Sequence, residues 1–210
     1  MRKKHIITLS GKPGSGKSST SDKVAEMLGY TRYSSGEMVR AMIKKKKITL
    51  ADFNKMAATD HSLDEEIDEK LRDLREQKDI VIDSRLGFYW IPESFKVYLD
   101  LDMDVATARI YKDTISNEGR AQGAGMASSI VDVQRQVQSR LNAETRRFKS
   151  MYGVDPYRNA NFDLVINTSR HSPQTVALTV FDNYKKWLKS DGWRPVQSEV
   201  PMGYSFDNQY

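Results

Sequence analysis

Short apolar runs and longer amphipathic segments follow one another along most of the chain. The runs "HIITL" (residues 5–9), "DIVID" (79–83) and "FKVYLDLD" (95–102) are rich in β-branched and aromatic residues and predict buried strands. Two longer segments, residues 17–28 and 128–153, have apolar residues at helical spacing and predict helices. Strands and helices in this order fit a parallel α/β sheet.

Another helix is expected at residues 62–77, "SLDEEIDEKLRDLREQ". Ser62 and Glu65 have the spacing of a capping box. Asp64 and Asp68 share a face that we expect to be exposed to solvent. The packing face consists of Leu63, Ile67, Leu71 and Leu74.

In two segments the apolar residues follow neither helical nor strand spacing. Residues 116–126, "SNEGRAQGAGM", are polar and glycine-rich and predict a mobile loop. Residues 189–210 contain several aromatic residues, so this tail either packs as an arm, contacts a partner or is disordered.

Composition narrows the class of protein. The 210 residues are 39% hydrophobic, enough to bury a core in one domain, and the absence of cysteine excludes disulfides, thiolate catalysis and Cys-based metal sites. A net charge of +5 suits nucleic acid, an acidic surface or a polyanionic small molecule, but we interpret the basic runs at residues 2–4 and 44–47 as solvated surface. No run has the length of a membrane span or a secretory signal, so we expect a soluble cytoplasmic protein.

Residues 11–18 match the phosphate-binding pattern G-x-x-x-x-G-K-[ST], between the first strand and the first helix. In such a loop, backbone N–H groups and the helix N-terminus face a polyphosphate, Lys17 reaches the β and γ phosphates, and Ser18 can ligate Mg²⁺. The residues expected to bind ATP are Gly11, Lys12, Pro13, Gly14, Ser15, Gly16, Lys17, Ser18 and Ser19.

ATPases, GTPases, motors and small kinases all use such a loop, so the group that receives the phosphate must be sought elsewhere in the chain. Ligands of parallel sheets bind beyond the carboxyl ends of the strands, where Asp83 and Arg85 follow the strand at 79–83. Asp83 is therefore placed to orient Mg²⁺ or its waters, and Arg85 to hold a second phosphate. A salt bridge at the end of the strand is the alternative.

The stretch "SSGEMVR" brings together Ser35, Gly36 and Arg40. A hydroxyl, a glycine and a guanidinium can bind a phosphate, although a serine N-cap beside a surface arginine would have the same sequence.

Arg140, Glu144 and Arg147 recur at i, i+4 and i+7, so they share one face of the helix at 128–153. That face is either a solvated salt-bridge ladder or part of a lid that delivers arginines over a transferring phosphoryl group.

In their order along the chain, these motifs resemble the cytidylate kinase family of P-loop nucleoside monophosphate kinases, particularly its short archaeal-type members. The landmarks span roughly residues 4–188 and are "GKPGSGKS", "SSGEMVR", "LDEEIDEKL", "VIDSRLGFYW", the R-E-R helix, "MYGVDPY" and "FDLVINTSRHSPQTV". The resemblance implies a kinase domain at residues 1–188, a three-layer sandwich with a five-stranded parallel sheet. It also implies a helical monophosphate-binding insertion at about residues 35–78 and a lid at about residues 113–150.

The resemblance further assigns roles to matching positions. Catalysis would use Lys17, Asp83, Arg140 and Arg147, with Ser18 and Asp83 holding Mg²⁺. The acceptor nucleotide would be bound by Ser35, Gly36, Arg40, Arg85, Arg140 and Glu144. In the family, the helix that corresponds to residues 62–77 flanks the acceptor base, which is the alternative to a solvated face there. One departure concerns the helix after "YLDLD", where the family commonly reads "RARRI" and this chain reads "VATARI", keeping only Arg109.

The implied activity is ATP- and Mg²⁺-dependent transfer of a phosphoryl group to CMP or dCMP by a monomer that binds small molecules, without a membrane or nucleic-acid partner. Two alternatives stay open: a kinase of the same fold acting on AMP, UMP or a small alcohol, and a nucleotide-binding switch protein. A switch would not need a second set of phosphate-binding arginines such as Arg40, Arg85, Arg140 and Arg147.

Overall fold

The computed structural model describes residues 3–57, 60–116 and 129–198. The strands are β1 (Ile6–Gly11), β2 (Thr31–Ser34), β3 (Ile80–Asp83), β4 (Phe95–Asp100), β5 (Leu164–Asn167) and β6 (Val196–Ser198). The helices are α1 (Lys17–Leu28), α2 (Ser35–Lys46), α3 (Leu50–Ala57), α4 (Ser62–Leu74), α5 (Gly87–Trp90), α6 (Met103–Ser116), α8 (Ile130–Tyr152) and α9 (Pro173–Lys189), with a 3₁₀ turn η1 (Asn159–Asn161).

The six strands form one parallel sheet in the order β2-β3-β1-β4-β5-β6. This confirms the predicted α/β fold but corrects the strand count from five to six. The extra strand comes from the tail, where Val196 pairs with Leu164 and Ser198 with Ile166. Because all strands run in one direction, their carboxyl ends lie at one edge, where the predicted site residues follow β1, β2 and β3.

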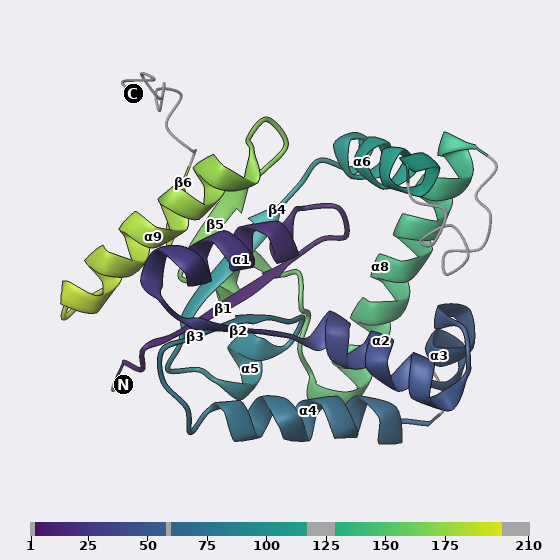
Figure 1. Cartoon of the computed structure of the whole chain (residues 1–210), viewed down its shortest axis with the longest axis horizontal. Coiled ribbons are helices and arrows are strands. Elements are labelled where there is room, and N and C mark those ends of the chain that lie inside the picture. The colour runs from purple at the N-terminus through teal and green to yellow at the C-terminus, as the bar shows by residue number, and fades with distance from the viewer. Residues whose placement is uncertain (1–2, 58–59, 117–128, 199–210) are drawn as a thin grey trace.

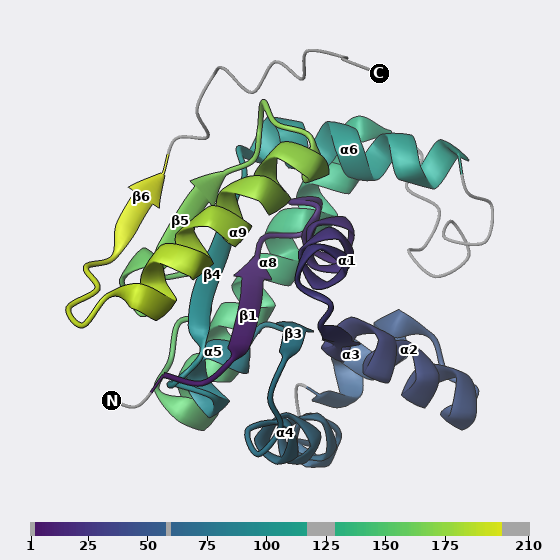
Figure 2. The ribbon, with the colours of Figure 1, turned by 60° about the vertical axis from the view of Figure 1, so that its left-hand side comes forward.

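Helices cover both faces of the sheet (Figure 1 and Figure 2). On one face, α1 and α9 pack over the strands through a core that includes Leu9, Val24, Phe95, Val180 and Tyr184. On the other face lie α4, α5 and part of α8. The three layers of the predicted sandwich are therefore present.

The segment between β2 and β3 is the helical insertion, formed by α2, α3 and α4. Its own apolar cluster joins Met42 of α2 and Phe53 of α3 to the stripe of α4 and to Ile80 and Ile82 of the sheet. The predicted stripe is confirmed, since Leu63, Ile67, Leu71 and Leu74 are all buried. Across the molecule, α8 packs on α6 through Val133, Val137 and Leu141, against Met103, Ile110 and Tyr111.

The described part of the tail packs on the sheet. Trp193 lies edge-on to Phe95, with ring centroids 5.9 Å apart, and its Nε1 donates to the Asp163 carbonyl oxygen at 3.1 Å. Residues 199–210, and residues 117–126 of the predicted mobile loop, lie outside the described residues.

Two expectations about α4 are wrong. Ser62 is the first residue of the helix rather than its N-cap, and its N–H donates to the Asp60 carboxylate at 2.9 Å, so no capping box forms. Asp64 and Asp68 are buried, with 6% and 4% exposure, because α5 and the end of α8 cover the face that was expected to meet solvent.

Candidate active site

The glycine-rich turn between β1 and α1 is folded around the side chain of Lys17. Gly11 approaches β4 so closely that a Cβ there would lie 2.3 Å from the Leu99 carbonyl oxygen. Gly16 precedes α1 at φ +79°, in the left-handed region that favours glycine. Lys17 Nζ donates to the carbonyl oxygens of Gly11 and Lys12, at 2.9 and 3.0 Å. An ammonium group thus lies among backbone groups beside a helix N-terminus, an arrangement that binds phosphate.

The groups around Lys17 change the pKa of its side-chain amine. Burial and the positive charge of Arg85 together lower the pKa of this amine to about 7, while Asp83 acts in the opposite direction. Arg140 also lowers it. A bound polyphosphate would supply negative charge and raise this pKa again. The same interactions show that both arginines lie within electrostatic range of the glycine-rich turn. We call this turn, residues 11–17, the cradle.

Ser18, in the first turn of α1, meets Asp83, the last residue of β3. Ser18 Oγ donates to Asp83 Oδ2 at 2.9 Å, and Asp83 is only 6% exposed. A hydroxyl oxygen and a carboxylate oxygen beside a phosphate cradle are the hard oxygen donors that Mg²⁺ prefers. The two predicted metal ligands are thus in hydrogen-bond contact, and their donor atoms fit a magnesium ion.

Arg85 and Arg140 share one carboxylate. Arg85 Nε donates to Glu144 Oε2 at 2.9 Å, and Arg140 Nε donates to Glu144 Oε1 at 2.8 Å. Among the described residues, no hydrogen bond uses the Nη atoms of either arginine. The carboxylate therefore fixes each guanidinium through one edge and leaves the Nη edge for another anion.

Tyr157 completes this cluster by donating its hydroxyl to Glu144 Oε2. Burial alone would raise the pKa of Glu144, but Arg85 and Arg140 outweigh it and hold that pKa well below its usual range. Burial would lower the pKa of Arg85, yet Glu144 raises it, so both groups stay charged at neutral pH. Two arginines held around one buried carboxylate form a preorganised cationic centre.

Ser35, Gly36 and Arg40 lie at the same edge of the sheet. The register of β2 and β3 pairs Ser34 with Asp83, and Ser35 Oγ donates to the Asp83 carbonyl oxygen at 3.3 Å. The side chain of Arg40 is 67% exposed and lies 3.9 Å from Glu37. Ser35 therefore lies beside the phosphate cradle, whereas Arg40 stands at the solvent side of the insertion. The serine N-cap considered for this stretch is Ser34, whose Oγ accepts from the Glu37 N–H.

Arg147 does not join the cluster around Glu144. Its Nε lies 3.2 Å from Asp64 Oδ2 on α4, and both side chains are largely buried. The predicted contact of Arg147 with a transferring phosphoryl group stays a prediction.

Sequence reasoning missed the roles of Arg32 and Tyr157. Arg32 Nη2 lies 3.6 Å from Asp83 Oδ2, while its other nitrogens pair with Asp22 and Glu37, so it supports the predicted metal ligand. The available signal was an arginine within the short β-prone run that becomes β2. For Tyr157 the only signal was its place in the landmark "MYGVDPY", which carries no chemistry by itself.

Arg109, the remaining arginine of its helix, braces the phosphate cradle from behind. Its Nη2 donates to the carbonyl oxygens of Thr168 and Ser169, at 2.8 and 3.3 Å, and its Nη1 donates to that of Gly14 at 3.4 Å. The guanidinium therefore links the tip of the glycine-rich turn to the loop after β5.

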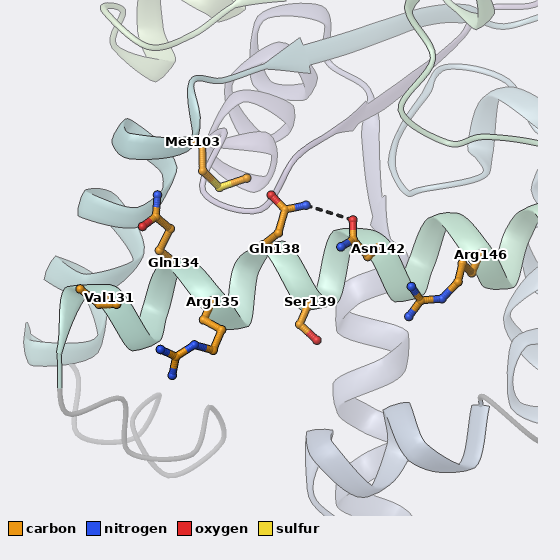
Figure 3. Close-up of a pocket in the computed structure, with 8 residues that line it drawn as sticks. All are labelled: Met103, Val131, Gln134, Arg135, Gln138, Ser139, Asn142 and Arg146. Carbon is orange, nitrogen blue, oxygen red and sulfur yellow. Dashed lines mark hydrogen bonds between the residues drawn. The ribbon is translucent and has the colours of Figure 1, made fainter.

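A separate groove of about 570 Å³ lies along α8 (Figure 3). Six of its eight lining residues are polar; the lining consists of Met103, Val131, Gln134, Arg135, Gln138, Ser139, Asn142 and Arg146. Residues 134, 138 and 142 lie roughly opposite Arg140 and Arg147 on the helix, by the 3.6-residue period. The groove is thus on the other side of α8 from Arg140 and Arg147 and contains no residue of the glycine-rich turn.

Two further features are absent from the part of the chain that the structure describes. Within residues 3–57, 60–116 and 129–198, no helix is long and apolar enough to cross a membrane. In the same ranges, no three His, Asp or Glu side chains gather closely enough to hold a metal ion by themselves. Any divalent ion at Ser18 and Asp83 would need further ligands from a phosphate or from water.

Known proteins resemble this chain over most of its length. The family model described as "Cytidylate kinase-like family" matches residues 6–170. A cytidylate kinase from Halobacterium salinarum is 33% identical over 198 residues, which cover 92% of this chain and 97% of that protein. A cytidylate kinase from Natronomonas pharaonis is 31% identical over 197 residues, covering 91% and 96%.

Solved structures resemble the fold at much lower identity. A shikimate kinase from Bacteroides thetaiotaomicron has a TM-score of 0.59 at 12% identity, covering 88% of this chain and 98% of that one. This similarity supports the P-loop kinase architecture and says nothing about the acceptor.

Proposed function

Because the chain belongs to the cytidylate kinase-like family and is a nucleoside monophosphate kinase, we propose that it transfers the γ-phosphoryl group of ATP to CMP or dCMP in the presence of Mg²⁺. The pyrimidine acceptor is proposed because the relatives that match nearly the whole chain are cytidylate kinases.

One observation carries the proposal of two neighbouring phosphate sites. The cradle around Lys17 lies within electrostatic range of a second cationic centre, because Arg85 and Arg140 both lower the pKa of Lys17. In this second centre, Glu144 holds the two arginines. A protein that only binds or hydrolyses ATP needs one phosphate site. Two sites within electrostatic range fit a donor and an acceptor phosphate brought together for transfer.

The proposed binding of ATP uses the glycine-rich turn. Backbone N–H groups and the N-terminus of α1 would bind the phosphates, and Lys17 would leave its two carbonyl partners to contact the β and γ phosphates. Ser18 and Asp83 would hold Mg²⁺, which supplies charge neutralisation at the phosphates when it is bound.

The acceptor would bind at the second centre. The Nη edges of Arg85 and Arg140 would hold the monophosphate, with Ser35, Gly36 and Arg40 on the insertion side. Glu144 would keep the two guanidiniums oriented rather than contact the phosphate, because two anions repel each other.

Transfer itself would require positioning and charge stabilisation more than acid–base chemistry. An oxygen of the acceptor phosphate is largely ionised at neutral pH and attacks the γ-phosphorus, while the bond from that phosphorus to the β–γ bridging oxygen breaks and ADP leaves. Lys17 and the two arginines would stabilise the charge on the transferring group. No protein base is needed for this step.

The test is a coupled assay of ADP release with ATP, Mg²⁺ and a panel of CMP, dCMP, UMP, AMP, GMP or no acceptor. We expect strong stimulation by CMP or dCMP. Turnover with another monophosphate would keep the mechanism and change the base, whereas ADP release that ignores every acceptor would refute the proposal.

The variant Arg85→Ala distinguishes acceptor binding from ATP binding. It should lower transfer by about a hundredfold or more, because a group stabilising the transferring charge is lost. ATP affinity should stay within about twofold of wild type or tighten slightly, because Arg85 no longer lowers the pKa of Lys17. Arg135→Ala, at an exposed residue on the far side of α8, is the matched control. Equal loss of ATP binding and transfer in Arg85→Ala would contradict the assignment.

The sequence-based expectation of a cytoplasmic monomer also remains a proposal, and light scattering of the purified protein tests the monomer.

A further inference from the structure

Two buried carboxylates on α4 have no role in the mechanism above. Asp68 Oδ1 accepts from Trp90 Nε1 at 2.9 Å, and Asp68 Oδ2 accepts from the Tyr152 hydroxyl. One turn earlier, Asp64 pairs with Arg147 at 3.2 Å. We call these five residues, Asp64, Asp68, Trp90, Arg147 and Tyr152, the α4 junction.

The junction connects three elements that are far apart in the sequence. Its acids come from the insertion, Trp90 comes from α5, and Arg147 and Tyr152 come from the last turns of α8, which end close to α4 (Figure 1). Two of these elements carry or adjoin the acceptor centre. Arg85 lies two residues before α5, and Arg140 lies two turns before Arg147 on α8.

The junction is not needed to attach α4 to the sheet. The apolar stripe of Leu63, Ile67, Leu71 and Leu74 already packs against Ile80 and Ile82. Burial raises the pKa of both acids, which means that their charged forms are destabilised where they lie. Well-packed apolar residues often stabilise such a position as well as or better than buried charges. Adhesion alone therefore does not account for the two acids. The two hydrogen bonds of Asp68 are directional and contribute orientation, while Asp64 and Arg147 form a close ion pair without a hydrogen bond between Oδ2 and Nε.

We propose that Asp64 and Asp68 are positioning residues that fix the orientation of α8 and α5 against the insertion, and thereby place Arg140 and Arg85 for the acceptor phosphate. This inference rests on the proposed function. Neither acid contacts substrate in this account, since both oxygens of Asp68 already accept hydrogen bonds and Asp64 is paired with Arg147.

The junction predicts an effect on one substrate and not on the other. It links elements of the acceptor centre, whereas the ATP cradle is built on β1 and α1 and is braced by Arg109. Loosening the junction should therefore raise the KM for the acceptor and leave the KM for ATP nearly unchanged. A purely structural role would lower the amount of folded enzyme and move both substrates' parameters together.

The experiment compares Asp68→Leu with Asp68→Asn. Leucine has a similar shape and removes both acceptors, so the acceptor KM should rise about tenfold or more, while the KM for ATP stays within about twofold. Asparagine keeps a carbonyl oxygen for Trp90 and offers an N–H to the Tyr152 oxygen, so it should restore the acceptor KM to within about threefold of wild type. Glu66→Gln is the matched control, because Glu66 is an exposed acid of the same helix, paired with Lys70 at 3.0 Å.

A double-mutant cycle with Asp64→Asn and Arg147→Gln tests the second pair and does not depend on Asp68→Leu being folded. The effects on acceptor kcat/KM should be non-additive, with the double variant closer to the worse single variant than to the product of the two. Tyr152→Phe, which removes one hydrogen bond, should raise the acceptor KM about threefold.

Three results would overturn the inference: an unchanged acceptor KM in Asp68→Leu, an equal rise of both KM values, or additive effects in the cycle. Failure of the proposed function looks different, since the wild-type enzyme itself would then transfer no phosphate to any monophosphate.

Discussion

Two carbonyl oxygens, which carry no net charge, are the hydrogen-bond partners of Lys17. In this setting, burial and Arg85 lower the pKa of the amine to about 7, so above that pH the free protein holds Lys17 mostly neutral. ATP should restore a high pKa and take up a proton as it binds. The apparent ATP affinity should then fall as the pH rises above 7, by up to about tenfold per pH unit.

Calorimetric titration at pH 8 in buffers of different ionisation enthalpy measures this proton uptake. Lys17→Arg keeps the charge at all these pH values and should abolish the uptake. ATP binding by the wild-type protein without proton uptake, and with constant affinity between pH 7 and 9, would show that Lys17 is already charged.

Glu144 holds both guanidiniums of the proposed acceptor centre. Glu144→Gln would leave Arg85 and Arg140 without their shared countercharge in a buried place and should destabilise the protein by about 3 kcal/mol. Tyr157→Phe, which removes one neutral donor to the same carboxylate, should cost about 1 kcal/mol. Urea unfolding measures both, and a change below about 0.5 kcal/mol in Glu144→Gln would argue against a buried ion cluster.

At the scale of elements, the features that depend on neighbouring residues were predicted correctly. The glycine-rich turn, the strands before and after it and the apolar stripe of α4 were all predictable, because period and turn chemistry act over a few residues. The exposure of Asp64 and Asp68 was predicted wrongly because their partners Trp90, Arg147 and Tyr152 lie more than twenty residues away. Sequence pattern does not report such contacts. The assembly of Ser18 with Asp83 was predictable only through the rule that parallel strands end at one edge.

Strand β6 was missed because three residues are too few to show a period. Its position is supported by Trp193, which packs on Phe95 and donates to Asp163. Trp193→Ala should therefore destabilise the protein by about 2 kcal/mol, whereas Trp193→Phe, which keeps a ring, should recover about half of this loss. Thermal unfolding provides the measurement. Equal stability of wild type and Trp193→Ala would mean that β6 does not contribute to the folded sheet.

At the scale of the whole molecule, the parallel sheet brings the residues of the two proposed phosphate sites to one edge from different layers. β1 and α1 provide the glycine-rich turn, and β3 provides Asp83 and the segment with Arg85. Arg140 and Glu144 come from α8, which lies on the other face of the sheet from α1 (Figure 2). The insertion lies beside this edge and is fixed to α8 by the α4 junction. Under the proposed function, two phosphate sites at this edge would bring two nucleotides together and exclude water.

Product analysis tests the central claim most directly. The protein is incubated with ATP, Mg²⁺ and CMP, and the nucleotides are separated by anion-exchange chromatography. Phosphoryl transfer predicts CDP and ADP in equal amounts, with little free phosphate. Formation of ADP and inorganic phosphate while CMP stays unchanged would contradict the account, because the cationic centre around Glu144 would then not bind a phosphate acceptor.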